Sequence, residues 1–171
     1  SKAAWSFDGS SYFEGISLNN YVLPGGSPAV SVFAVVYLAA FTGTPEIVQI
    51  GTDHATSLNS FQFAVWTDGG LYGAAYGGEG NERYTAAGTL TTSTWALAEW
   101  IVSPGAFGAG NPAFKKNGAS AASTRGTGSG TPNIQPASVR VGANLQGSPA
   151  QLFPSGSKLA ELIVMNSVDA A

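Results

Sequence analysis

Hydrophobic and polar positions alternate along much of this chain with the two-residue period of a β-strand. Between residues 61 and 66, Phe61, Phe63 and Val65 fall on one face, whereas Gln62 and Trp66 fall on the other. Clusters of Gly, Pro, Asn and Asp separate such runs at the spacing typical of sandwiches and barrels. The pattern predicts an all-β fold, a two-sheet antiparallel β-sandwich with about 11 to 14 strands.

The expected strands and turns follow from the same pattern. The strands are residues 4–8, 12–16, 30–41, 46–51, 61–67, 71–76, 83–86, 95–103, 113–116, 119–123, 138–142 and 158–165. Asp68-Gly69-Gly70 and Asn117-Gly118 should form tight hairpin turns, because Asp-Gly and Asn-Gly tolerate the positive φ that such turns need. Residues 104–112 and 124–136 should be long, mobile surface loops rather than linkers between domains.

The run from residue 30 to 41 is apolar on both faces of its expected strand. A sandwich strand normally leaves one face to water, so the second apolar face needs a cover. Two covers are open: a loop folded over the sheet, or a subunit interface. In the second case Phe33, Tyr37 and Phe41 are the candidate contacts.

Composition narrows the class of protein. The 171 residues suit a single domain spanning 1–171, and 44% of them are hydrophobic, enough to bury a core. Only 10% are charged, against about 25% in ordinary soluble domains. The net charge of −3, without a basic cluster, argues against nucleic acid as a partner. The longest apolar run is too short to span a bilayer, which predicts no membrane insertion.

Several segments, taken in order, resemble one superfamily. They are Trp5-Ser6-Phe7-Asp8-Gly9-Ser10-Ser11-Tyr12-Phe13, the apolar run 30–41, the strand from Trp95, Phe114-Lys115-Lys116-Asn117-Gly118, Val139-Arg140-Val141-Gly142 and the closing run 153–166. This order resembles the concanavalin A-like lectin/glucanase superfamily, in particular laminin G-like jelly-roll domains of phage, virion-surface and bacterial extracellular proteins. The resemblance implies a jelly-roll sandwich at an extracellular or virion surface; ligand identity does not follow, because one fold hosts many functions.

The carboxylates give no sign of an enzyme. Glycoside hydrolases of this superfamily use two carboxylates flanking the scissile bond, and no expected strand carries such a pair. The nearest pair, Glu79 and Glu82, reads as a solvated turn beside Arg83. Glu99, in the middle of a strand, is expected to be hydrogen-bonded at the sheet surface. The sequence predicts no catalytic residues.

Metal sites are also poorly supported. The chain has no cysteine and one histidine, His54, which makes a transition-metal site improbable. Relatives of this type often hold Ca²⁺ in loops at one rim, and Asp53, Asp68 and Glu79 are the weak candidates here. They form no acidic cluster, so we expect no cofactor and leave Ca²⁺ as an open alternative.

Aromatic side chains in the middle of the chain suggest sugar binding, because aromatic faces pack against pyranose C–H groups. The candidates are Tyr72, Tyr76, Tyr84 and Trp66, with Asn81 as a hydroxyl partner. The favoured hypothesis is a non-catalytic lectin-like module that binds carbohydrate or a cell-surface polymer. The alternative is a structural assembly protein, such as a phage decoration or tail-associated protein, with a capsid or tail protein as partner. A glycan-cleaving enzyme is the least favoured.

Overall fold

A computed structural model describes residues 3–16, 29–51, 60–76, 80–108, 110–133, 138–144 and 150–167. These residues form β-strands and no helix, so none of them makes a helix long and apolar enough to cross a membrane. The strands are β1 (Trp5–Ser6), β2 (Phe13–Ile16), β3 (Val30–Tyr37), β4 (Glu46–Gly51), β5 (Ser60–Val65), β6 (Leu71–Tyr76), β7 (Gly80–Thr85), β8 (Trp95–Val102), β9 (Ala113–Lys116), β10 (Ala119–Ala121), β11 (Ser123–Arg125), β12 (Ser138–Val141) and β13 (Lys158–Met165).

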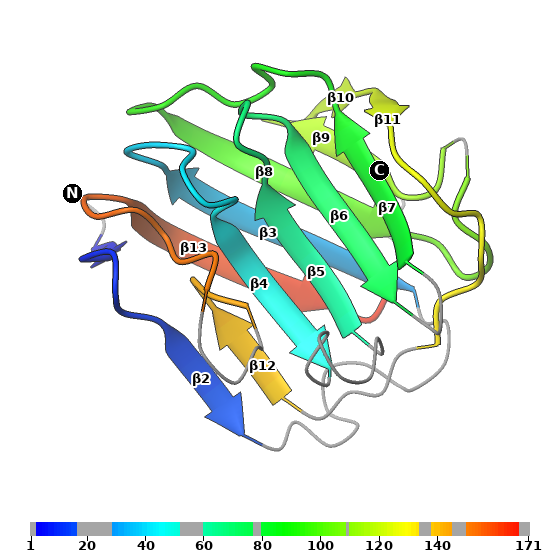
Figure 1. Cartoon of the computed structure of the whole chain (residues 1–171), viewed down its shortest axis with the longest axis horizontal. Coiled ribbons are helices and arrows are strands. Elements are labelled where there is room, and N and C mark those ends of the chain that lie inside the picture. Colours follow the sequence, from blue (N-terminus) through cyan, green and yellow to red (C-terminus); the bar gives the residue numbers. More distant parts are fainter. Residues whose placement is uncertain are drawn as a thin grey trace.

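The strands form two antiparallel sheets stacked face to face (Figure 1). One sheet has six strands in the order β1-β13-β3-β8-β9-β10, and the other has seven in the order β11-β7-β6-β5-β4-β12-β2. The predicted two-sheet antiparallel sandwich is therefore confirmed. Each sheet joins strands from distant parts of the sequence, because β13 pairs with β3 and β12 lies between β4 and β2.

Four strands, β4, β6, β9 and β13, have the predicted bounds, and most others differ by a few residues at an end. The largest difference concerns the expected strand 119–123. Residues Ala119–Ala121 pair with β9 in the six-stranded sheet, whereas Ser123–Arg125 pair with β7 in the seven-stranded sheet. The chain thus changes sheets within a run that reads as continuous.

The segment after β11 is held by side chains of β7. Arg83 donates hydrogen bonds to the carbonyl oxygens of Thr127 and Gly128, at 2.9 and 2.8 Å. Asn81 Oδ1 accepts a hydrogen bond from the Gly130 amide at 2.7 Å. The described part of the loop expected over residues 124–136 is therefore attached to the sheet edge at residues 127, 128 and 130.

Both predicted hairpin turns are present. Gly69 has a φ of 82°, and the Gly70 amide donates to Asp68 Oδ1 at 2.9 Å. In the second turn Asn117 and Gly118 have φ values of 52° and 79°. Positive φ at both central residues is the geometry that matches the twist of paired strands.

The core lies between the sheets and follows the predicted alternation. Phe61, Phe63 and Val65 of β5 point inward and are buried. Trp100 of β8 stacks on Phe63, with ring centroids 5.7 Å apart, and meets Phe61 edge to face at 5.4 Å. Aromatic pairs in these geometries add to the stabilisation that burial alone provides.

The outward face of β3 differs from its core face. Phe33 and Tyr37 point away from the core and are partly exposed, and Phe33 lines an open groove on this face. Phe41 lies beyond the end of β3 and packs against the core cluster. Of the three candidate contacts, Phe33 and Tyr37 thus share the outer face and Phe41 does not.

Gly73 allows Trp100 to lie against the seven-stranded sheet. A Cβ at residue 73 would overlap the indole, reaching Trp100 Cε2 at 2.6 Å. The backbone conformation at residue 73 does not require glycine. Glycine is required because the indole ring of Trp100 occupies the space that a side chain would fill. Glycine at this point of β6 is therefore required by packing.

We predict that Gly73→Ala lowers the free energy of unfolding by about 2 kcal/mol, the usual cost of overpacking a core. A chain of this length should then melt about 4 to 8 °C lower. Gly108→Ala is the matched control, because a Cβ there meets nothing within 4 Å. Thermal unfolding followed by circular dichroism measures both, and equal melting temperatures would contradict the packing argument.

Candidate functional site

An aromatic cluster lies on the outer face of the seven-stranded sheet, over β5, β6 and β7. Its members are Trp66, Tyr72 and Tyr84. Trp66 meets Tyr84 edge to face with centroids 5.0 Å apart, and Tyr72 lies 4.9 Å from Tyr84 and 5.5 Å from Trp66. Tyr72 is only 3% exposed, whereas Trp66 and Tyr84 remain partly exposed. Two rings are thus presented to solvent above a buried third.

Strand register brings these rings together. Tyr72 of β6 is directly opposite Tyr84 of β7 on one side and Ala64 of β5 on the other. Directly opposite residues on one face of a sheet have their Cβ atoms within contact distance. The small side chains of Ala64 and Ala74 leave room around Tyr72, and Trp66 follows the end of β5.

Glu82 places a carboxylate beside the cluster. The Tyr84 hydroxyl donates a hydrogen bond to Glu82 Oε2, and the Tyr72 hydroxyl lies 3.4 Å from Oε1. Glu82 lies within β7 and is partly exposed, so the expected solvated turn around it is wrong. The carboxylate is held in one orientation by two phenols.

Arg125 closes one side of the cluster. Its guanidinium carbon lies 5.6 Å from the centre of the Tyr84 ring, and its Nη1 pairs with Asp68 at 2.7 Å. The hydrogen bond from Arg125 holds the pKa of Asp68 below its usual range. The positive charge beside Tyr84 is therefore already matched by Asp68.

Polar side chains extend from the cluster across β5 to β4. Gln62 Nε2 donates to Glu46 Oε2 and, at 2.9 Å, to Gln151 Oε1. The Tyr72 hydroxyl lies 3.4 Å from Gln62 Oε1. These contacts join the aromatic cluster to a buried polar network. Such a network stabilises the fold only when each of its polar atoms has a hydrogen-bond partner.

Glu46 is the exception within this network. Its side chain is fully buried, and Oε1 has no hydrogen-bond partner. Burial raises the pKa of Glu46 well above its usual range, and the hydrogen bond from Gln62 opposes that rise only in part. The environment therefore favours the neutral carboxylic acid.

Arg140 lies at the far end of the same face, on β12. Its Nη2 pairs with Glu14 at 2.9 Å, and Nη1 donates to the Asn144 carbonyl at 2.6 Å. The guanidinium also lies 4.8 Å from the Tyr12 ring centre. Like Arg125, this cation is matched by a carboxylate.

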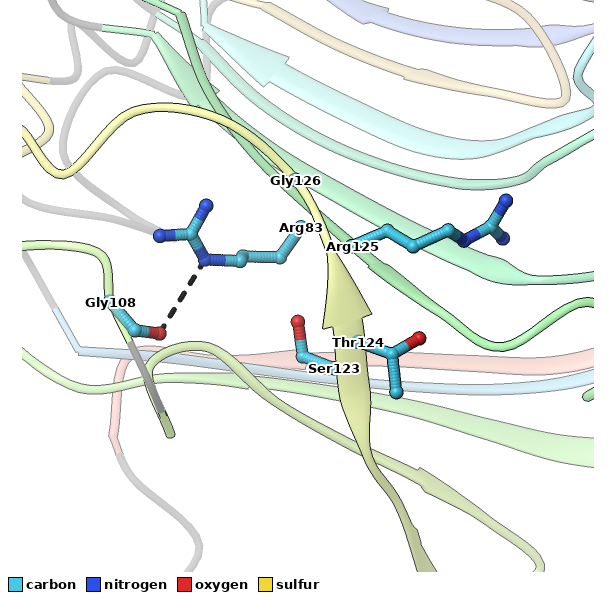
Figure 2. A pocket seen from close by; sticks show the side chains of 6 residues that line it. All are labelled: Arg83, Gly108, Ser123, Thr124, Arg125 and Gly126. Carbon is cyan, nitrogen blue, oxygen red and sulfur yellow. Dashed lines mark hydrogen bonds between the residues drawn. The ribbon is translucent and has the colours of Figure 1, made fainter.

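A cleft of about 260 Å³ lies at the edge of the sandwich beside β11. Figure 2 shows Arg83 and Arg125 extending from it in opposite directions, with Arg83 directed at the Gly108 carbonyl. The donors of Arg83 bond backbone carbonyls, and those of Arg125 bond Asp68 and the Thr85 carbonyl. The two arginines therefore hold loops in place and do not converge on the cleft.

The remaining predicted residues either lie apart from the aromatic cluster or fall outside the described residues. Asn81 is buried and bonds the Gly130 amide, so it lies apart from the aromatic cluster. Tyr76 is in β6, but its side chain is outside the described residues, as are Asp53, His54 and Glu79. In the described part of the chain, no three acidic or histidine side chains gather as metal ligands would.

Glu99 behaves as predicted, because its Oε1 accepts a hydrogen bond from the Gly118 amide at 2.8 Å. Glu46 and Gln151 were not predicted to matter. The alternation of residues 61–66 already placed Gln62 on the face of Trp66, which was a signal for the network. No local pattern marks Gln151, which lies 89 residues from Gln62 in sequence.

Many solved structures share the two-sheet fold of this chain. The carbohydrate-binding module CBM40 of the Ruminococcus gnavus IT-sialidase, bound to α2,3-sialyllactose, matches with a TM-score of 0.69 at 10% identity, over 98% of this chain and 91% of that one. Domain 4 of the arabinanase AbnA from Geobacillus stearothermophilus, in complex with arabinotriose, matches with a TM-score of 0.56 at 16% identity, over 96% and 71%.

Mouse laminin α1 domains LG4-5 match with a TM-score of 0.57 at 14% identity, over 98% of this chain and 44% of that one. The fold is the concanavalin A-like jelly roll. No protein-family model and no curated protein sequence matches the chain. At these identities the likeness establishes the jelly-roll fold alone, so any function must be argued from the side chains.

The buried carboxyl of Glu46 predicts a measurable pH dependence. Because its pKa is raised in the folded jelly roll, the unfolded chain loses this proton first, near pH 4.5. Stability contributed by this group therefore falls as the pH rises from 4.5 towards the folded-state pKa. Relative to Glu46→Gln, the wild type should lose stability as the pH is raised over this window.

Urea unfolding at a series of pH values measures this difference. Glu161→Gln, at an exposed position, is the control for removing a carboxyl group, with all curves measured at a protein concentration low enough that the chain is monomeric. Stability curves of wild type and Glu46→Gln that run parallel between pH 4.5 and 8 would show that Glu46 has no raised pKa.

Proposed function

We propose that this protein is a non-catalytic carbohydrate-binding module whose site is the aromatic cluster. The observation that carries the proposal is the pair of partly exposed rings, Trp66 and Tyr84, held 5.0 Å apart beside the Glu82 carboxylate. Aromatic faces pack against the C–H groups of a sugar ring, and a planar carboxylate accepts hydrogen bonds from its hydroxyls. Tyr72 supports both rings from below.

The fold neighbours support this class of ligand. The Ruminococcus module binds α2,3-sialyllactose and the Geobacillus domain binds arabinotriose. Sugar binding is thus compatible with the jelly-roll framework, although fold likeness alone does not transfer a ligand. An extracellular or particle-surface location, where glycans and cell-surface polymers are displayed, belongs to the same proposal.

The charges around the cluster favour a neutral saccharide. Glu82 contributes a carboxylate, whereas Arg125 and Arg140, the described cations on this side of the molecule, are each paired with an acid. A sialylated or otherwise acidic sugar would bring a second negative charge towards Glu82 without a free cation to match it. Like charges in a partly desolvated site cost several kcal/mol.

The same carboxylates support binding over cleavage. A general acid must reach the glycosidic oxygen, and Glu46, whose raised pKa would suit that role, is fully buried. Glu82 accepts the Tyr84 hydroxyl and lies in contact with Tyr72. An assembly role on a virion, with a capsid or tail protein as partner, stays a second proposal, supported by the open apolar face of the six-stranded sheet.

Binding should depend on the exposed rings. We predict that Trp66→Ala and Tyr84→Ala each weaken binding to a neutral oligosaccharide by at least about fivefold, because stacking on an aromatic face contributes about 1 kcal/mol or more. Trp5→Ala, which removes a tryptophan that is 54% exposed elsewhere, is the control and should bind normally. A glycan array of neutral and acidic oligosaccharides selects the ligand, and titration calorimetry measures each variant.

Absence of binding across the array, or binding that Trp66→Ala retains, would sink this assignment. Release of reducing sugar from the same oligosaccharides would overturn the non-catalytic part of the proposal.

Glu82 should decide between neutral and acidic sugars. We predict that Glu82→Gln weakens binding to the neutral ligand by about tenfold, since a charged acceptor contributes more than a neutral one. The same change should narrow the preference for that ligand over its sialylated form, because the repulsion is gone. An unchanged ratio of the two affinities in calorimetry would contradict the neutral-sugar assignment.

A further inference from the structure

The outer face of the six-stranded sheet carries an open apolar groove. It has a volume of about 240 Å³ and lies over β3, β8 and β13. Its lining residues are Phe33, Val35, Leu97, Glu161 and Ile163. Ile163 is 43% exposed and adjoins the other apolar residues of the groove, so the exposed apolar surface is a patch and not a single side chain.

Aromatic side chains continue this face beyond the groove. Tyr37 and Trp95 lie opposite each other on β3 and β8, with ring centroids 5.7 Å apart, and Trp95 is 44% exposed. Lys158 Nζ lies 5.5 Å from the centre of the Tyr37 ring. A contiguous apolar surface with aromatic anchors and a charged rim is typical of protein interfaces.

The rim charges are arranged symmetrically about the centre of this face. In the sheet order, β13 and β9 are the strands on either side of the central pair β3 and β8. β13 carries the exposed Glu161, opposite Val35, and β9 carries Lys115, opposite Glu99. Opposite charges thus stand at equal strand spacing from the middle of the groove.

We propose that this face joins two copies of the chain about a twofold axis that runs parallel to the strands, above β3 and β8. Such an axis places β13 of each copy over β9 of the other. The contact between Glu161 of one copy and Lys115 of the other then occurs once on each side of the axis, and the two apolar grooves cover each other. The match of one surface to itself is what a twofold interface requires.

The geometry of the sheets allows this packing. Two sheet faces pack with their strands aligned to within about 30°. Glu161 is level with Val35, whereas Lys115 is level with Glu99 and Phe33. Glu161 and Lys115 are therefore offset by two residues along the strand direction. Two residues correspond to about 7 Å along the strands, and facing sheets lie about 10 Å apart, a combined distance that the lysine and glutamate side chains can span together.

The interface lies on the opposite side of the sandwich from the aromatic cluster. A dimer of this kind would present its two aromatic clusters in opposite directions and could bridge two glycans. Both clusters could bind glycans on one surface only if those glycans were flexible. The inference does not rest on the proposed function, because binding of a soluble oligosaccharide by calorimetry is measured per chain whatever the oligomeric state.

Charge reversal tests the arrangement. We expect the purified chain to form a dimer that dissociates on dilution in sedimentation velocity experiments. Glu161→Lys and Lys115→Glu should each raise the dimer dissociation constant by at least about tenfold, because each brings like charges together. The double variant Glu161→Lys/Lys115→Glu should restore the dimer, since the pair is then reversed and not lost.

Two further variants separate interface from folding. Lys116→Glu is the matched control, because this neighbour of Lys115 points to the other face of β9 and should leave the dimer unchanged. Ile163→Asp should abolish the dimer while leaving the melting curve of the monomer intact. A chain that stays monomeric at every concentration would overturn the proposal and leave this face to another protein. A dimer whose dissociation constant neither single charge reversal raises would also overturn it. So would a double variant that dimerises no more tightly than the two single variants.

Discussion

Trp100 crosses the sandwich from β8 and packs against Gly73 of β6, where a side chain on the glycine would overlap the indole. The ring also stacks on Phe63, so it forms an aromatic contact between the two sheets. Because residues alternate along a strand, the neighbours of Gly73 turn outward. Tyr72 thereby becomes the floor of the aromatic cluster, and the packing of the core sets the position of the candidate site.

The outer face of the seven-stranded sheet is unusual in burying polar groups. Gln62, Glu46 and Tyr72 are all almost inaccessible, and hydrogen bonds between them offset the cost of removing them from water. At Glu46 that offset is incomplete, and burial raises the pKa of its carboxyl group above the usual range. Rigidity obtained in this way benefits recognition, because side chains already held in place lose little entropy when a ligand binds.

The two outer faces of the sandwich have different chemistry, which separates two kinds of contact. One combines partly exposed rings with a carboxylate, a combination suited to hydroxyl-rich ligands. In the described residues, the other presents Phe33, Ile163 and Trp95 with only two carboxylates among them, Glu161 at the groove and the hydrogen-bonded Glu99 opposite Phe33, a combination suited to another protein surface. The two outer faces can differ because side chains alternate along each strand. Only the inward residues of each sheet form the shared core.

Alternation and turn chemistry determined the strands, the hairpins and the inward set at Phe61 and Phe63, because these depend on neighbours in the chain. The same local signals placed Trp66 and Tyr84 among the candidates. Tertiary structure alone decided that Glu82 lies in a strand between two phenols, and that Gln151 meets Gln62 across 89 residues. Such pairings depend on which distant strands become neighbours, and that is chosen by the packing of the whole core.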